Sequence, residues 1–145
     1  MDKIEQLRTN NTVPRDMMMN WKEANQLRAA GFYIGSHSRT HPMLASLSNE
    51  TEIRDELEHS ANRIESELGE RPLTISYPIG SWDERVTKIS ELCGYKYGLA
   101  VEQRFYKPGN DNIYTIPRVE LYNEPWWKAR LRISGLYQVV KKLVK

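Results

Sequence analysis

Apolar residues recur every three or four positions through the middle of the chain, which is the spacing of one buried helical face. The clearest stretch runs from Asn49 to Leu68, and Gly69 follows where a helix end favours glycine. The pattern therefore predicts a long helix with one face in the core. His59 lies almost opposite Leu57 on this helix and is predicted to be a surface histidine. The buried stripe comprises Ile53, Leu57, Ala61, Ile64 and Leu68.

Two shorter helices are predicted on either side of the long one. Asn20 and Glu23 have the spacing of a capping box at the start of a helix over 21–30. Asp83 can cap a second helix, which carries a short apolar stripe of its own. This stripe comprises Val86, Ile89, Leu92 and Cys93, the single cysteine of the chain.

Apolar runs between the helices predict β-strands at 32–35, 73–77, 97–101 and 114–121, and Pro117 marks the last of these as an edge or an end. Helices and strands alternate at short intervals, which is typical of parallel α/β units. In such sheets the functional residues gather in the loops that follow the carboxyl ends of the strands. The residues predicted at these ends are His37, His41, Tyr77, Pro78, Gly80 and Arg118.

The length of 145 residues predicts one domain with a sizeable core. Hydrophobic residues make up 39% of the chain, and none of its apolar runs approaches the ~20 residues of a membrane-spanning helix. The N-terminus lacks the apolar stretch of a secretory signal, so the expected location of the chain as it stands is cytoplasmic. Residues 1–19 are the least regular part and are predicted to form an irregular N-terminal segment.

The net charge of +2 hides an uneven distribution. Residues 124–145 carry six Lys/Arg and one Glu, a charge of +5, which leaves −3 for the rest of the chain. This segment is predicted to be a basic amphipathic helix, bent near Ser134 and Gly135. It could attach to an anionic membrane or a lipid-linked glycan, but the favoured interpretation is a terminal helix packed on the domain with its charges in solvent. No base-reading motif accompanies the charge, so nucleic-acid binding is not predicted.

Two of the three histidines, His37 and His41, lie four residues apart just after an apolar run. Neutral imidazole nitrogens suit Zn²⁺ and similar ions. Gly35 and Pro42 bracket the pair and argue against a helix through it. The helical metalloprotease motif also requires a Glu directly after the first His, where this chain has Ser38. The pair is therefore interpreted as metal ligands on a loop.

From about residue 18 to residue 121, the chain resembles the polysaccharide deacetylase family, which is the NodB homology domain of carbohydrate esterase family 4. The resemblance rests mainly on the histidine motif at 35–42 and on Tyr77-Pro78-Ile79-Gly80. Further matching stretches are 19–21, 44–48, 56–57, 68–69, 93–95 and 116–119.

The resemblance implies a partial, distorted (β/α) barrel that lacks its first strands. It implies a metal ion, usually Zn²⁺ or another divalent transition metal, with His37 and His41 as two of its ligands. The substrate would be an N-acetylated polysaccharide or glycolipid. The backbone N–H of Ile79 would stabilise the oxyanion, and Arg118 would lend an auxiliary positive charge. The residues expected to face the substrate are Tyr77, Pro78, Ile79, Gly80 and Trp82; Trp82 equally fits the role of covering a strand end.

The chain also departs from the family pattern. The family takes its catalytic base and third metal ligand from an Asp-Asp pair, and this sequence contains no such pair. It also lacks the late Leu-x-x-His motif that supplies a general acid in many members. Ser76 replaces the arginine that some members have in their third motif. No residue of the chain is therefore predicted to be the catalytic base.

Three functions remain open from the sequence. The first is a metal-dependent deacetylase whose catalytic base comes from outside this chain. The second is a catalytically inactive module with a carbohydrate-binding, structural or oligomerisation role. A third possibility is an interaction protein built around the basic segment 124–145. A barrel without its first strands exposes strand edges, so a homo-oligomer is expected, in which residues 1–19 cover or exchange across the gap.

Overall fold

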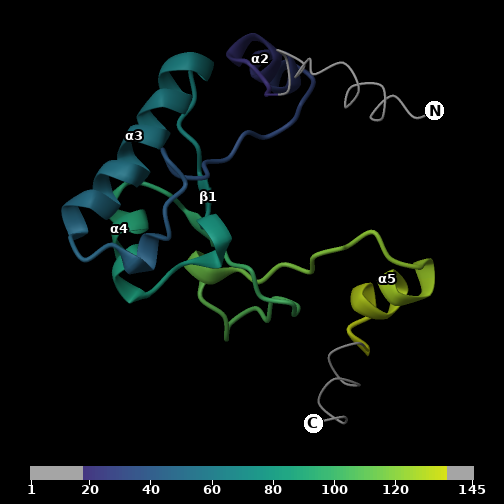
Figure 1. Ribbon diagram of the computed structural model, residues 1–145. Coiled ribbons are helices and arrows are strands. Elements are labelled where there is room, and N and C mark those ends of the chain that lie inside the picture. The colour runs from purple at the N-terminus through teal and green to yellow at the C-terminus, as the bar shows by residue number, and fades with distance from the viewer. Residues whose placement is uncertain (1–17, 137–145) are drawn as a thin grey trace, which may run out of the picture. The chain divides into compact units, whose positions relative to one another are not determined.

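The computed structural model describes residues 18–136, and the chain divides into two compact units, Met1–Tyr33 and Ile34–Lys145 (Figure 1). The described part of the first unit contains helix α2, Trp21–Ala29. The predicted capping box is confirmed, because Asn20 Oδ1 accepts the Glu23 N–H at 3.0 Å and the Asn20 N–H reaches the Glu23 carboxylate at 2.8 Å.

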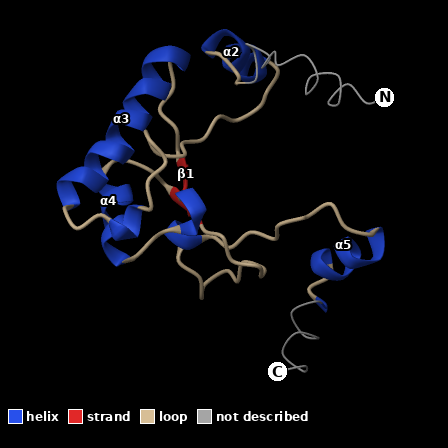
Figure 2. Ribbon diagram, in the orientation of Figure 1, coloured by secondary structure: helices blue, strands red, loops and turns tan. Residues whose placement is uncertain are grey.

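The second unit contains helices α3 (Glu50–Leu68), α4 (Glu84–Leu92) and α5 (Trp126–Ile133), together with strands β1 (Thr74–Ser76) and β2 (Tyr97–Leu99) (Figure 2). Three single 3₁₀ turns lie between them: η1 (Leu44–Ser46), η2 (Pro78–Gly80) and η3 (Ile113–Thr115). The α3 prediction is confirmed in detail, since the Asn49 side chain caps its first turn and Gly69 ends it with φ of 75°.

The sheet is short and parallel. β1 pairs with β2 in the register Thr74 to Tyr97, Ile75 to Gly98 and Ser76 to Leu99. Single parallel bridges extend it on both sides, from Ser36 to Ile75 and from Leu99 to Ile116. The parallel α/β prediction is therefore confirmed, with four paired segments that follow chain order.

Two predicted strands are wrong in extent. The strand at 32–35 reduces to the bridge at Ser36, because Ser38, with φ of 66°, turns the chain directly afterwards. The strand at 114–121 reduces to the bridge at Ile116, because the preceding residues form η3. The Asn112 side chain accepts the Tyr114 N–H at 2.8 Å and so favours a turn there, and Pro117 has no N–H to continue the ladder.

The core lies where α3 and α4 cover the sheet. The α3 stripe is buried as predicted, and Ile75, Val86 and Ile89 pack in the same cluster. The prediction that Leu92 belongs to the buried stripe of α4 is wrong, because this residue is 61% exposed. After Ile89 the next buried apolar residue on this face is Cys93, which caps the end of α4.

A buried polar network ties the first sheet segment to α3. The Tyr95 hydroxyl lies 2.8 Å from Ser36 Oγ and 2.9 Å from the Leu57 carbonyl oxygen, and Ser36 Oγ lies 2.8 Å from Ser60 Oγ. Burial raises the pKa of Tyr95 to about 12, so the phenol stays protonated. Because Ser36 immediately precedes His37, this network fixes the base of the histidine loop.

Candidate active site

His37 and His41 leave the sheet together on the loop after Ser36. Their ring centroids lie 4.9 Å apart with the ring planes at 75°. Two imidazoles that share one tetrahedral ion, each about 2.1 Å away through nitrogen, would have centroids roughly 5 Å apart. Both side chains are exposed. The spacing therefore fits two ligands of one metal ion.

The tautomer of His37 is set by β1. Its Nδ1 lies 2.6 Å from the Ser76 carbonyl oxygen. A carbonyl oxygen only accepts, so Nδ1 carries a proton, and in the neutral imidazole the lone pair is then on Nε2. A metal-ligating histidine commonly has its second nitrogen bonded in this way, because the bond orients the ring and raises its basicity. The imidazole of His37 is thus prepared to bind a cation through Nε2.

The loop between the histidines is held in an unusual backbone conformation. Ser38 and His41 have φ of 66° and 63°, in the left-handed region that non-glycine residues rarely adopt. The His41 N–H donates to Ser38 Oγ at 3.0 Å and closes a tight turn. Positive φ at such residues persists only where surrounding contacts enforce it, and such strain clusters at functional sites.

Glu56, on α3, supplies those contacts, and sequence reasoning gave it no role in the site. Its carboxylate accepts the Arg39 N–H at 3.0 Å, the Thr40 N–H at 2.8 Å and the Thr40 hydroxyl at 2.6 Å. Burial opposes the charge of Glu56, but the bonds from Thr40 and Arg39 outweigh it and lower the pKa of the carboxyl below its ordinary value of 4.5. The helix therefore anchors the loop through a carboxylate that stays ionised.

We expect this anchor to fail in acid. A carboxyl whose folded pKa is lowered contributes stability above its unfolded pKa and loses it as the pH falls through the folded value. Glu56→Gln should cost about 1 kcal/mol of unfolding free energy near neutral pH, and the gap to wild type should close as the carboxyl protonates. Chemical unfolding across this pH range measures the gap. The exposed Glu58, on the same helix, is the control; an equal effect of Glu58→Gln would contradict the anchor.

A second loop, after β1, carries the tetrapeptide 77–80. Ile79 sits in the left-handed region with φ of 56°, and its side chain is 68% exposed. Bonds from the Gly80 N–H to the Tyr77 carbonyl and from the Ser81 N–H to the Pro78 carbonyl close the turn around it. Among the hydrogen bonds of the described residues, none uses the Ile79 N–H. This N–H is available to an acceptor outside the chain.

The side chains of Tyr77 and Pro78 do not line this surface. Both are fully buried, and the Tyr77 hydroxyl donates to the Tyr114 carbonyl at 2.9 Å. Burial raises the pKa of Tyr77 to about 12. The expectation that the side chains of Tyr77 and Pro78 face the substrate is therefore corrected, because both lie in the core. Trp82 is half-buried and packs against the core.

Arg118 lies beside the first loop. Its Nε donates to the Ala100 carbonyl at 3.2 Å, and its Nη1 donates to Ser76 Oγ at 3.4 Å. Ser76 is also the residue whose carbonyl accepts from His37. A guanidinium is thus held next to the residue that orients the first histidine.

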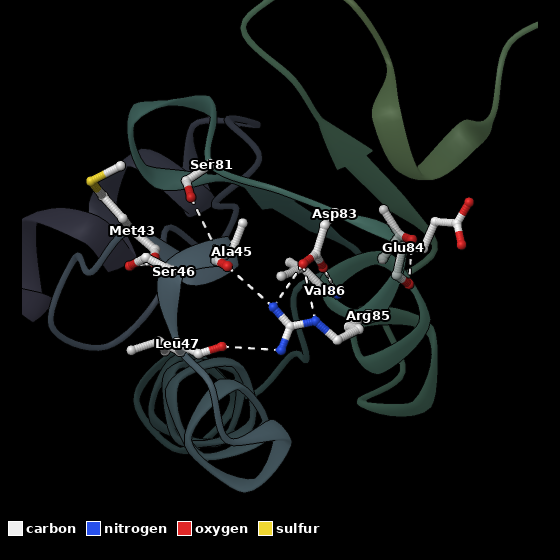
Figure 3. A network of polar contacts seen from close by, with 10 residues as sticks. Met43, Ala45, Ser46, Leu47, Ser81, Asp83, Glu84, Arg85 and Val86 are labelled. Carbon is white, nitrogen blue, oxygen red and sulfur yellow. Dashed lines mark hydrogen bonds and ion pairs between the residues drawn. The ribbon is translucent and has the colours of Figure 1, made fainter.

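Arg85 ties the two loops together (Figure 3). Its guanidinium bonds to the Ala45 and Leu47 carbonyls, each at 3.1 Å, and to Asp83 at 2.8 Å. The Ala45 N–H donates to Ser81 Oγ at 3.1 Å. Residues 44–47 follow the histidine loop, whereas Ser81 and Asp83 follow the Ile79 turn, so this network fixes one loop against the other. The sequence offered no local signal for it, since Arg85 lies about 40 positions from its carbonyl partners.

The donor set is incomplete within residues 18–136. His37 and His41 fit two metal positions, but the described residues contain no group of three His, Cys, Asp or Glu side chains that could hold an ion. A cavity of about 500 Å³ between α3 and α4 is lined by other residues, among them Arg54, Glu84 and Lys88. It includes none of the residues predicted for the site.

Solved structures of other proteins share the fold of this chain. A de-N-acetylase from Aggregatibacter actinomycetemcomitans has a similar structure, with a TM-score of 0.70, 15% identity and coverage of 85% of this chain and 56% of that one. The deacetylase PplD of Streptococcus pyogenes, in complex with acetate, gives a TM-score of 0.69 and 18% identity over 74% of this chain and 47% of that one. A CE4 family pseudoenzyme from Bacillus anthracis is 30% identical, with a TM-score of 0.50 over 52% of this chain and 27% of that one.

This chain therefore spans between about a quarter and just over half of each of these structures. None of the curated proteins matches it. The fold likeness identifies the α/β unit as similar to the NodB deacetylase barrel with a truncated sheet. The sequence pattern named polysaccharide deacetylase matches residues 7–98, which is more than half of the chain. The chain belongs to the polysaccharide deacetylase family.

Proposed function

We propose that this chain removes acetyl groups from an N-acetylated polysaccharide or glycolipid, using a divalent metal ion, in the first place Zn²⁺, held by His37 and His41. The observation that carries the proposal is the bond from His37 Nδ1 to the Ser76 carbonyl, which leaves Nε2 free for a cation next to the second imidazole. A bound ion of this kind supplies a Lewis acid for the acyl carbonyl and an activated water near neutral pH.

The remaining residues have supporting roles in this proposal. The unbonded N–H of Ile79 donates to the oxygen that becomes negative as the acyl carbon turns tetrahedral. Gly80 keeps the turn compact, because its φ of 70° suits glycine and a Cβ there would overlap Val101. Arg118 stabilises nearby negative charge, and the exposed part of Trp82 lies against a sugar ring.

The third ligand and the general base are proposed to be carboxylates from outside residues 18–136. They come either from the N-terminal part of the chain or from a second chain, which would make the active unit an oligomer. The base would take the proton of the attacking water, and the leaving amine would receive a proton as the C–N bond breaks.

Acetate release from a soluble N-acetylated glucosamine oligomer tests the proposal. The zinc-loaded chain should release acetate, and both His37→Ala and His41→Ala should reduce the rate to background, because each removes a ligand. An enzymatic acetate assay measures the rate. Loss of activity with Leu92→Ala, an exposed position outside the site, would contradict the assignment, as would activity that survives both histidine variants.

A second candidate function is a catalytically inactive module that binds the same glycans. It is favoured by the absence of a three-donor metal cluster among the described residues and by the pseudoenzyme among similar structures. If the zinc-loaded chain binds the N-acetylated glucosamine oligomer but releases no acetate at any protein concentration, the inactive module is the correct function. Release that rises with protein concentration would select an oligomeric enzyme.

A further inference from the structure

The C-terminal helix exposes the side chains that a helix normally buries. Within α5 only Ala129 is buried, while Trp126 is 72% and Trp127 59% exposed. We name the exposed apolar residues in and next to this helix the tryptophan surface: Leu121, Trp126, Trp127, Ile133 and Leu136. Sequence analysis favoured a helix packed on the domain by its apolar face. Within the described part of 124–145 the large apolar side chains do not follow this expectation, because Trp126, Trp127, Ile133 and Leu136 are each at least 50% exposed. Residues 137–145 lie outside the described residues.

The helix is held by its other side. Arg132 forms an ion pair with Glu124 at 2.6 Å, and both side chains are largely buried. The Arg132 guanidinium also lies 5.0 Å from the centre of the Tyr122 ring. At the helix end, a Cβ on Gly135 would come within 2.7 Å of the Phe105 ring, so Gly135 permits a close approach there. The first two contacts tie the helix to the residues just before it, and the third brings the end of the helix against Phe105, while the tryptophan surface stays exposed.

The exposed charges on α5 are positive, whereas the nearest acids, Glu120 and Glu124, are bonded to Tyr122 and to Arg132. Glu124 is the only acid in residues 121–136, and the ion pair with Arg132 neutralises it. Lys128 and Arg130 remain exposed, and the Lys128 ammonium lies 5.4 Å from the centre of the Trp127 ring. The sequence after Leu136 adds three lysines and no acid.

We propose that the tryptophan surface binds the interface of an anionic phospholipid membrane. Tryptophan rings favour the boundary between headgroups and acyl chains, where an apolar ring and a polar N–H are both satisfied. Lysine and arginine beside them are attracted to acidic headgroups. No helix within residues 18–136 is long and apolar enough to cross a bilayer.

The positive charges argue against two other partners for this surface, a second copy of the chain and a neutral glycan. A symmetric contact between two copies of this surface would bring two positively charged faces together, and like charges repel. A neutral N-acetylated glycan could stack on the tryptophans but would not use the cations. An acidic lipid surface satisfies both the apolar and the cationic side chains. The proposal does not depend on the deacetylase function.

Vesicle binding by the full chain tests this proposal. We expect sedimentation with phosphatidylcholine vesicles that contain phosphatidylglycerol, a blue shift of tryptophan fluorescence, and release at high salt. The double variant Trp126→Ser/Trp127→Ser should lower the partition coefficient at least about 10-fold, and Lys128→Gln/Arg130→Gln roughly 30-fold.

Matched controls come from α4, which carries an exposed leucine and an exposed lysine. Leu92→Ser and Lys88→Gln should bind vesicles as wild type does, and circular dichroism should be unchanged in every variant. Equal binding to vesicles of phosphatidylcholine alone, or equal losses in the controls, would overturn the proposal. So would self-association without lipid that Trp126→Ser/Trp127→Ser abolishes, because a second copy would then cover this surface.

Discussion

Replacing His37 or His41 with alanine is expected to lower the Zn²⁺ affinity of the chain by roughly 100-fold or more, whereas Arg39→Ala should leave it within about 2-fold. The histidines provide the two imidazole donors, and the Ser76 carbonyl orients the ring of His37. Arg39 contacts Glu56 through its backbone N–H, which alanine retains. Isothermal titration calorimetry of the purified, metal-free protein with Zn²⁺ measures the three affinities.

Two results would contradict this assignment. Equal losses in all three variants would mean that the loop conformation, and not the imidazoles, determines binding. Unchanged affinity in both histidine variants would mean that the ion binds elsewhere. Tight stoichiometric binding by wild type would show in addition that a third ligand exists, since two imidazoles alone form a weak and open site. No binding above background would favour the inactive module.

Gly98→Ala is expected to produce the largest loss of stability among single methyl additions in the sheet, about 3 kcal/mol or more. Gly98 lies in the middle of β2, paired with Ile75. A Cβ there would overlap the carbonyl oxygen of Tyr114 and the hydroxyl of Tyr77, and a backbone carbonyl cannot rotate away as a long side chain can. The bond between these two groups would also be disturbed. Urea unfolding followed by circular dichroism measures the change.

Gly69→Ala is the matched control for this prediction. Gly69 has a left-handed backbone, with φ of 75° at the end of α3, and nothing lies within 4 Å of a Cβ built there. The substitution should therefore cost only the left-handed backbone strain, about 1 kcal/mol. If both substitutions cost the same, the close approach of the η3 segment to β2 would not limit the size of residue 98.

The elements that the sequence predicted well are those whose signals are local. The helix over 50–68 combines an apolar stripe with a capping side chain and a terminal glycine, and each of these signals lies within a few residues. The alternation of side chains between the two faces of β1 was a further local signal, which the prediction for Tyr77 did not use. Ile75 and Tyr77 are two positions apart and share one face, and both are fully buried. This alternation would have placed the Tyr77 ring in the core.

The parts that were missed depend on contacts between distant segments. Glu56 bonds to residues 16 and 17 positions away, and Arg85 to carbonyl groups 38 and 40 positions away. Nothing in the local pattern distinguishes these side chains from solvated charges on a helix. The histidine pair was visible because its spacing is short, whereas the contacts that hold its loop became visible only with the fold.

The order of the sheet has a consequence for how the protein reaches its native state. Within residues 18–136 each strand pairing joins segments that follow one another in the order of the sheet, so this part of the sheet can grow in one direction as synthesis proceeds. The loop with His37 and His41 is synthesised before the residues that restrain it, which follow in sequence: Glu56 with α3, then Ser76 with β1 and Arg85 with α4. A nascent chain would therefore acquire an ordered histidine loop in steps and well before its C-terminal helix exists.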